Sequence, residues 1–513
     1  MAASLHFVST LTLPVLADRL GQVACGQRSV VETLYLDRAD RWLRRHGWLL
    51  ECTCAQQQVR LRLRRLDQGS ALTVDQPTCV PATVAAIHAP AMRARLTGLL
   101  GDCALECVQR WHSEVWHGVH RDQAGVDICA IVLTAHHSGR TTRPLDPPLM
   151  LELIAQRGYG RATRAWAGTL PNNVPVTALA HDCHRLLEQA YVAAAIRVPS
   201  MGDTALVAGQ PALPVIADVL LVQALTMAAC LPPAATALGP EQVHDFRVAL
   251  RRSRALLRGF KQVVGADLER HFRREFAWLS RATSRLRDLD VMAAEVALPA
   301  WPYGELAEPE RAALGAFIDQ LRAHDQAALL QRLQAPRYTN VQSLWQTTLA
   351  HWRLHGAGAG HVLGACAGAA IAAALARTHR QAVALLHEPS TPALHELRKR
   401  YKRLRYLVEP CAALYARVDV GAVLTELKRL QTMLGERCDW QAQLALLARW
   451  RRRRAAPRLS PALRAALSAM HRRLHARVTL ALAEDATVLD AVGAFDHADR
   501  RGAFADLVRE LAG

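Results

Sequence analysis

Lysine, aromatic residues and acidic residues are all scarce in this sequence. Lysine occurs only four times in 513 residues, and aromatic residues make up 5% of the chain. Asp and Glu total 45 against 63 Lys and Arg, so the formal net charge is +18. Such an excess destabilises a compact protein unless a counter-charge offsets it, which indicates an anionic partner. Nucleic acid, a phosphate polymer and a lipid surface all fit this description.

The cysteines do not form a zinc pattern. The closest pairs among the 12 are Cys52 with Cys54 and Cys103 with Cys107, and neither has the doubled C-x₂-C spacing of a structural zinc site. We therefore expect reduced, mostly buried thiols in a cytoplasmic protein without a bound metal.

No stretch of the sequence is convincing as a signal peptide or a membrane span. Residues 5–17 are moderately apolar, but no basic residue precedes them. The run 357–376 has the length of a transmembrane helix. Its high content of Gly and Ala, together with His361, favours instead a helix packed closely inside a protein core. We expect no membrane association.

The first third of the chain has a strand pattern. Residues 59–66 alternate between arginines and the apolar residues Val59, Leu61 and Leu63, as a half-buried strand does. Further strands are expected over 104–119, 126–135 and 149–155, and a short helix or turn over 37–50 leading into a strand.

The remainder changes to helical patterns. Residues 166–211 contain several prolines and are expected to form a connector with its own helix. From about 212, long amphipathic segments joined by short loops continue to the end of the chain. The sequence therefore predicts a β domain over 1–165 and a helical domain over 212–510.

The helical part contains an internal repeat. His244 and His395 are 151 residues apart, and the same offset relates several similar pairs. These pairs are Arg247 and Arg398, Arg251 and Lys402, Arg252 and Arg403, Arg254 and Arg405, and Asp288 and Asp439. One offset without a gap indicates two copies of a helical unit, over about 212–335 and 357–510.

Each copy has a stripe of positive charge. At about 100° per residue, a helix places one set of cationic residues within a stripe of roughly 80°. In the first copy these are His244, Arg247, Arg251, Arg254 and Arg258; in the second they are His395, Arg398, Lys402 and Arg405.

Like charges at this spacing repel one another by a few tenths of a kcal/mol per pair. A solvated basic face, or neutralisation by acidic helices elsewhere, would explain one such helix. Two copies favour a groove for a linear polyanion, because each guanidinium can bind phosphate oxygens bidentately. Neighbouring cations are also expected to hold the pKa of both histidines below about 6.5.

Two other functions fit the stripe less well. Single-stranded nucleic acid needs aromatic side chains among the arginines, and these are missing here. His244-Asp245 and His395-Glu396 are similar to the His-Asp pair of metal-dependent phosphohydrolases. No further histidine has a matching spacing in both copies, so we expect no metal site.

Four segments resemble the CHAD domain, the conserved histidine α-helical domain: "VHDFRVALRRSRALLRGF", "RLRDLDV", "LHELRKRYKRLRYLVEP" and "LKRLQTMLGERCDW". The resemblance covers roughly 215–508. It implies two pseudo-symmetric four-helix bundles that bind inorganic polyphosphate in a basic groove between them, often on polyphosphate granules. Two departures from the family pattern are Cys438 and Ser284. The candidate binding residues are His244, Arg247, Arg251, Arg252, Arg254, Arg258, His395, Arg398, Lys402, Arg403, Arg405 and Lys428.

The N-terminal region resembles a degenerate CYTH domain, which is a β-tunnel that binds triphosphates. "ETLYLDRADRWLRRHGWLL" is similar to the segment around the family's Tyr-Asp-Thr motif, and "LMLELIAQRG" keeps a late acidic residue, Glu152. The first strand should contain Glu-x-Glu-x-Lys, whereas "MAASLHFVST" has no acidic residue and no lysine, and Glu51 stands about where the family has an arginine. Metal-assisted hydrolysis needs clustered carboxylates, so we expect no catalytic residues.

The sequence thus predicts a multidomain α+β protein with a CYTH-like antiparallel β-tunnel followed by an all-α CHAD domain. Its expected function is polyphosphate binding without a cofactor, in a granule-associated or regulatory protein of the cytoplasm. One alternative is an inorganic triphosphatase that acts through the N-terminal domain. The other is a nucleic-acid-binding protein.

Overall fold

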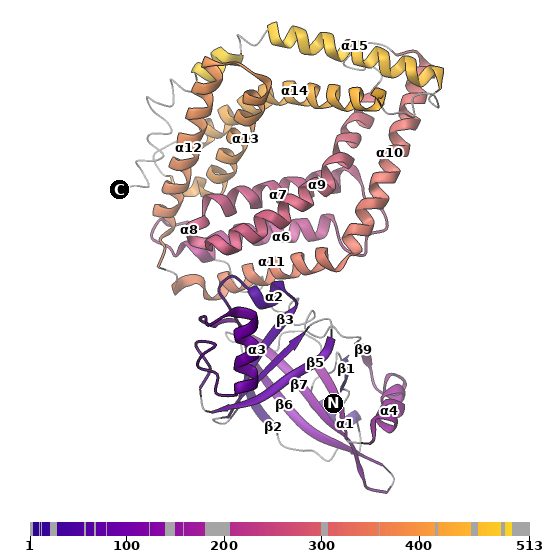
Figure 1. Ribbon diagram of the computed structural model, residues 1–513, viewed down its shortest axis with the longest axis vertical. Helices are drawn as coiled ribbons and strands as arrows, with labels where there is room; N and C mark the ends of the chain where they lie inside the picture. Colours follow the sequence, from indigo (N-terminus) through magenta and orange to yellow (C-terminus); the bar gives the residue numbers. More distant parts are fainter. Residues whose placement is uncertain are drawn as a thin grey trace. The chain divides into compact units, whose positions relative to one another are not determined.

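The computed structural model divides the chain into two compact units, Met1–Pro199 with Ser343–His351, and Ser200–Gln342 with Trp352–Gly513. The residues it describes are 4–9, 11, 13–20, 28–55, 58–65, 68–77, 79–122, 124–138, 149–156, 158–179, 206–298, 306–358, 360–415, 419–452, 460–483 and 488–494. Figure 1 shows a sheet with short helices in the first unit and long helices in the second.

The first unit is built on a nine-stranded sheet whose order is β5-β4-β3-β2-β6-β7-β8-β1-β9. Every pairing in it is antiparallel, as the CYTH resemblance implies. The strands are β1 Ser4–Ser9, β2 Arg28–Asp37, β3 Trp48–Ala55, β4 Gln58–Arg65, β5 Gln68–Pro77, β6 Glu106–Arg121, β7 Asp127–Ser138, β8 Leu149–Ala155 and β9 Val176–Leu179. The helices are α1 Leu13–Arg19, α2 Trp42–Arg45, α3 Pro90–Leu100 and α4 Gly160–Asn173.

Two apolar clusters form the core of this unit. In β4 the predicted alternation is confirmed, since Val59, Leu61 and Leu63 are buried in a cluster that also contains residues of α3. The second cluster joins β1, β7 and β8 to residues of α1 and α4. Burial of apolar area at roughly 25 cal/mol per Å² is the main force that holds these helices to the sheet.

The sheet extends past the predicted boundary at residue 165. That boundary lies inside α4, and β9 pairs with β1 in antiparallel register. The β domain therefore includes residues up to Leu179. The remainder of the expected connector helix, residues 180–205, lies outside the described residues. The strand β1 occupies the predicted position of the first strand and contains no acidic residue.

The second unit contains two copies of a four-helix order, which confirms the internal repeat. Their first two helices start at the same 151-residue offset, Ala212 with Leu363 and Pro240 with Thr391. The first copy consists of α6 Ala212–Cys230, α7 Pro240–Gly259, α9 Ala266–Val296 and α10 Glu308–Gln334, and the second of α12 Leu363–His387, α13 Thr391–Val408, α14 Val420–Arg452 and α15 Pro461–Ala483. The remaining helical segments are α8 Lys261–Val264, η2 Gly356–Gly358, η3 Glu409–Leu414 and α11 Pro336–His355, of which Ser343–His351 belong to the first unit.

A reciprocal contact shows that the two copies are related by a pseudo-two-fold axis. The amide of Ala212 donates to the carbonyl of His361 at 2.8 Å, and the amide of Leu363 donates to the carbonyl of Gln210 at 2.8 Å. The 151-residue offset exchanges these two hydrogen bonds, which is the signature of an isologous interface. The equivalent helices α10 and α15 also pack on each other (Figure 1).

Among the described residues, one helix is long and apolar enough to cross a membrane, namely α6. Half of its apolar stretch is buried inside the protein, where it packs on α7 and α12. The run 357–376, by contrast, belongs to η2 and α12, and Gly364 at the start of α12 lies against Ala208. The part of this run that belongs to α12 is therefore packed closely inside the protein, as the sequence predicted.

Candidate anion-binding site

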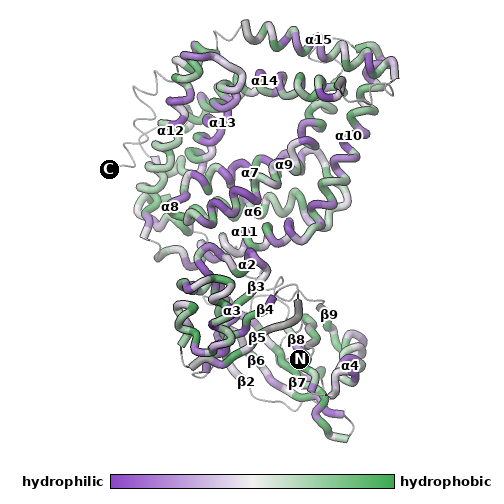
Figure 2. Tube along the Cα trace, viewed as in Figure 1, coloured by the Kyte–Doolittle hydropathy of each residue, from purple (hydrophilic) through white to green (hydrophobic). Residues whose placement is uncertain are grey.

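The helices α7 and α13 have the same amphipathic pattern (Figure 2). In α7 the buried face includes Val243, Phe246, Leu250 and Leu257. At the 151-residue offset α13 buries Leu394, Leu397, Tyr401 and Val408. Because the apolar faces are fixed in their cores at equivalent positions, the cationic stripes also occupy equivalent positions on the two helices. The helices α7 and α13 contact each other.

The two stripes meet at Arg251 and Lys402, which are equivalent residues of the repeat. Burial, followed by the charges of Arg398 and Arg251, lowers the pKa of the Lys402 ammonium to about 8. Arg251 of α7 thus lies within electrostatic range of Lys402 of α13. Burial is the main cause of this low pKa, and the neighbouring arginines lower it further against the opposing charge of Asp439.

The next pair of equivalent arginines is held by different partners in the two copies. Arg398 forms two hydrogen bonds with the carboxylate of Asp439, at 3.0 and 3.2 Å. Arg247 instead donates to the carbonyl of Ser280 at 3.0 Å and to the hydroxyl of Thr283 at 3.1 Å. Both guanidinium groups are therefore positioned by the helix that follows the stripe, α14 in one copy and α9 in the other.

A glycine borders one of these two arginines. A Cβ atom at Gly435 would lie 3.3 Å from Nη2 of Arg398, so a side chain there would crowd the guanidinium. The equivalent residue in the first copy is Ser284. The departure at Ser284 thus replaces a glycine that, in the second copy, borders a predicted binding arginine.

Both histidines begin their stripes next to cations. Burial, followed by the charges of Arg287 and Arg251, lowers the pKa of His244. Burial, followed by Lys399 and Arg398, lowers the pKa of His395. The expected direction is confirmed in both copies, although burial precedes neighbouring charge as the cause. We call His244, Arg247, Arg251, Arg287, His395, Arg398 and Lys402 the central cluster.

Carboxylates border the central cluster on α9 and α14. The pKa of Asp288 is raised, mainly by burial; the charge of Arg247 opposes this shift and the charge of Asp439 adds to it. The equivalent residues Asp288 and Asp439 therefore lie within electrostatic range of each other. In the described part of the chain, no group of three His, Cys, Asp or Glu residues could hold a metal ion.

Of the predicted residues that lie outside the central cluster, three have distinct surroundings. Arg252 and Arg405 share one carboxylate, that of Glu409, at 3.3 and 3.2 Å. Their guanidinium groups also lie 5.8 and 5.1 Å from the ring centroid of Tyr406. Lys428 is exposed on α14 and forms no ion pair within the described residues. These three side chains are not part of the central cluster.

The structure also adds residues that were not among the candidates. Arg287 lies beside both His244 and Arg247. It directly precedes Asp288 in the "RLRDLDV" segment, so its position in the sequence was a usable signal. Arg377 of α12 lies beside Arg258 and has no comparable signal, because α12 has no cationic stripe.

The N-terminal sheet offers a weaker candidate site. Glu152 on β8 is half-buried and faces away from the adjacent core residues Leu151 and Leu153. Glu51 on β3 pairs with Arg64 at 3.1 Å, and four strand positions separate β3 from β8. These carboxylates do not form the cluster that a catalytic metal ion requires.

The same face of the central strands is filled by side chains. Trp111 and Ser113 of β6 and His136 of β7 are buried there. The Ser113 hydroxyl lies 2.8 Å from Nδ1 of His136, and the rings of Trp111 and His136 make an edge contact at 5.5 Å. Packing of this kind leaves little room for a triphosphate between these strands.

Comparisons with known proteins bear on both units. A family model described as the CHAD domain matches residues 223–448, and no curated protein matches the chain. The CHAD domain from the plant Ricinus communis is 22% identical, with a TM-score of 0.43, over 57% of this chain and 95% of its own. PptA from Streptomyces chartreusis is 20% identical, with a TM-score of 0.41, over 55% and 99%. A Hippeastrum protein named as an adenylyl cyclase with a dominant triphosphatase activity is 14% identical, with a TM-score of 0.28, over 37% and 96%.

The matched segment begins in α6, ends in α14 and contains both cationic helices, α7 and α13. Residues 223–448 of this chain therefore form a CHAD domain.

Proposed function

We propose that this protein binds inorganic polyphosphate at the central cluster. The observation that supports the proposal is the approach of Arg251 to Lys402 across the pseudo-two-fold axis, with the pKa of the lysine lowered to about 8. The protein holds like charges together at a cost in stability, and a bound polyanion would offset that cost. The CHAD family resemblance implies the same ligand.

The chemistry of the cluster fits a phosphate chain better than a nucleic acid. Its members are arginines, a lysine and histidines, which donate to phosphate oxygens and carry no information about bases. The Tyr406 ring lies beside Arg252 and Arg405 rather than free to stack on a base, and the aromatic rings of Phe246 and Tyr401 on the stripe helices are buried. A cytoplasmic location on polyphosphate granules is part of the proposal, because the ligand accumulates there.

Reversal of the two central charges tests the proposal. We expect Arg251→Glu combined with Lys402→Glu to lower polyphosphate affinity at least a hundredfold, because two attractive contacts of about 1.5–3 kcal/mol each become repulsive. Affinity would be measured by titration of the intact chain, with circular dichroism as the check on folding. Arg332→Glu combined with Arg464→Glu is the matched control, since it changes net charge equally at exposed positions on α10 and α15.

Competition separates this function from nucleic-acid binding. Polyphosphate should displace bound DNA or RNA of equal total charge, and the reverse displacement should be weak. Wild-type affinity in the folded double variant, or preferential binding of nucleic acid, would contradict the proposal.

A further inference from the structure

The two copies of the repeat differ in charge at one end of the stripe. Arg258 in the first copy is equivalent to Glu409 in the second, because the two positions are 151 residues apart. The same offset gives three more comparisons: Arg377 with Thr226, Arg400 with Ala249, and Arg403 with Arg252. At three of these four positions one side of the pseudo-two-fold axis has a cation where the other side has a neutral or acidic residue.

On the Glu409 side the positive charge of Arg252 and Arg405 is partly offset by one carboxylate. The Glu409 carboxylate accepts from Arg252 at 3.3 Å and lies 3.2 Å from Arg405. The side chain of Glu409 is only 24% exposed, so water screens these ion pairs incompletely. An anion that approached this side would meet a half-buried carboxylate of its own charge.

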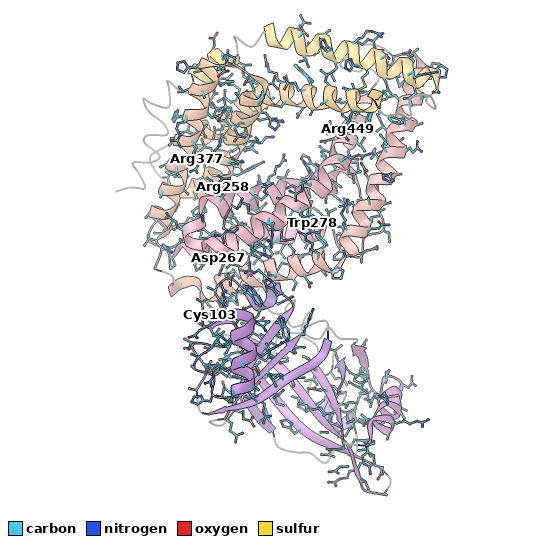
Figure 3. The ribbon with its side chains drawn as sticks, in the orientation of Figure 1. Cys103, Arg258, Asp267, Trp278, Arg377 and Arg449 are labelled. Atoms are coloured by element: carbon cyan, nitrogen blue, oxygen red, sulfur yellow. The ribbon has the colours of Figure 1, made fainter. Side chains whose placement is uncertain are left out.

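On the Arg258 side the positive charge accumulates. Arg258 is exposed at the end of α7, and its charge, after burial, lowers the pKa of Arg377 on α12. Burial and Arg258 likewise lower the pKa of Arg403 on α13. Figure 3 shows the labelled residues Arg258 and Arg377 near each other. Three helices thus contribute cations to one place.

We call this group the α12-side cluster, and it consists of Arg254, Arg258, Arg377, Arg400 and Arg403. Among the described residues, one carboxylate pairs with the cluster, that of Glu396, at 2.9 Å from Arg400 and 3.8 Å from Arg403. Glu396 also binds Lys399 at 2.6 Å, so its single charge is divided among three cations. Arg254 donates to the hydroxyl of Ser280 at 3.0 Å, which positions its guanidinium without neutralising it.

The α12-side cluster continues directly from the central cluster. Arg258 follows Arg251 by seven residues, or about 10 Å along the axis of α7, and Arg254 lies between them on the same stripe. On α13, Arg403 is the next residue after Lys402. A linear anion held between Arg251 and Lys402 could therefore extend onto these arginines.

On the basis of the proposed function, we propose that the α12-side cluster is a second phosphate-binding subsite that takes the continuation of a chain held at the central cluster. Polyphosphate then leaves the central cluster toward α12, while Glu409 closes the equivalent exit on the other side. The site is directional although the fold that carries it is pseudo-symmetric. Long chains bind more tightly than short ones because they reach both clusters.

The test compares long-chain polyphosphate with tripolyphosphate on the intact protein. For Arg258→Glu we expect affinity for the long chain to fall about tenfold, the loss of one charge-assisted contact. Affinity for tripolyphosphate, held at the central cluster, should fall by a far smaller factor. Arg377→Ala should act in the same direction, and Arg332→Glu, with the same charge change on exposed α10, should leave the ratio of the two affinities unchanged.

Variants of Glu409 supply the reciprocal measurement. Glu409→Gln releases Arg252 and Arg405 from their shared carboxylate, so it should raise affinity for the long chain several-fold. If the wild type binds neither polymer, the proposed function and this inference both fall. If it binds the long chain but Arg258→Glu weakens both polymers by the same factor, or weakens neither, the central cluster stands and the second subsite is refuted.

Discussion

Lys402 is the residue at which the two copies differ in the kind of cation they present to each other. Its equivalent is Arg251. Arginine as a residue type keeps its charge, whereas a lysine can lose it when it is buried. The charged groups that face Lys402 are Arg398 and Arg405 on α13, Arg251 on α7 and Asp439 on α14. Only Asp439 favours the protonated amine. The lysine therefore makes the strength of the site depend on pH.

We expect polyphosphate affinity to increase as pH falls from about 9 to about 7. The free protein has a Lys402 pKa of about 8, so the amine is largely neutral at the upper end of this range. A bound polyanion favours the charged form and raises the pKa, so binding takes up a proton and weakens as pH rises through 8. Lys402→Arg keeps the charge at every pH and should flatten this part of the profile. Titrations at constant ionic strength measure both proteins.

The histidines give the same profile a second component at lower pH. Since burial and neighbouring cations lower the pKa of His244 and His395 in the free protein, their proton uptake upon binding begins at lower pH than that of Lys402. This component should persist in Lys402→Arg and disappear when both histidines are replaced by Gln. A pH profile that is flat in the wild type, or a slope that none of these substitutions changes, would show that Lys402 and the two histidines do not take up protons when polyphosphate binds.

At the scale of elements, the contact between residues 208–212 and 361–364 fixes one copy of the repeat against the other. Two backbone hydrogen bonds of 2.8 Å cross it, and the amide of Gly364 donates to the carbonyl of Ala208 at 2.9 Å. A Cβ atom on Gly364 would lie 2.8 Å from the Cβ of Ala208 and 3.3 Å from its backbone. The second residue of α12 therefore has to lack a side chain.

Gly364→Ala should lower the free energy of unfolding by about 1–3 kcal/mol, the usual cost of overpacking, because backbone rather than a flexible side chain has to move. Gly315→Ala is the matched control. Gly315 lies within α10, a Cβ atom there would have no neighbour within 4 Å, and the protein should gain about 0.5–1 kcal/mol from the better helix propensity of Ala. Urea denaturation gives both values. Equal destabilisation by the two substitutions would show that the contact at Gly364 is not tight.

The elements that the sequence predicted are those with strong periodicity. Alternation identified β4, and the 151-residue repeat located α7 and α13 together with their cationic stripes. The strand β9 is only four residues long and depends on its pairing with β1, so no local pattern distinguishes it from a connector. Its omission is why the predicted domain boundary was placed too early.

The sequence also predicted the candidate site only in part. The stripe placed Arg405 with Lys402, but Glu409, four residues further along the helix, binds its guanidinium. That ion pair was readable from the i,i+4 spacing. The role of Arg377 could not be predicted in this way, because it belongs to an alanine-rich helix. The packing of α12 on α13 brings it to Arg258 and Arg403. Spacing along one helix predicts a stripe, whereas the counter-charges around it depend on tertiary contacts.

At the scale of the whole molecule, the two units differ in how their cationic side chains are arranged. The helical unit gathers cations from both copies of its repeat. The N-terminal unit pairs several of its strand arginines with carboxylates, as in Arg28 with Glu114 at 2.8 Å and Arg110 with Glu32 at 3.0 Å. An arginine already paired within its own sheet has less attraction left for a phosphate. This contrast argues that the helical unit carries the binding function.

We therefore expect the intact protein to release no phosphate from tripolyphosphate above background, with either Mg²⁺ or Mn²⁺ present. Hydrolysis assisted by a divalent ion needs several carboxylates directed at one point. In the described strands, Glu51 is paired with Arg64, Glu152 lies four strand positions away, and β1 contains no carboxylate at all. The measurement is phosphate release over time, with and without a chelator. Turnover that requires metal and is lost in Glu152→Gln, while Arg251→Glu with Lys402→Glu leaves it intact, would place a triphosphatase in the N-terminal unit.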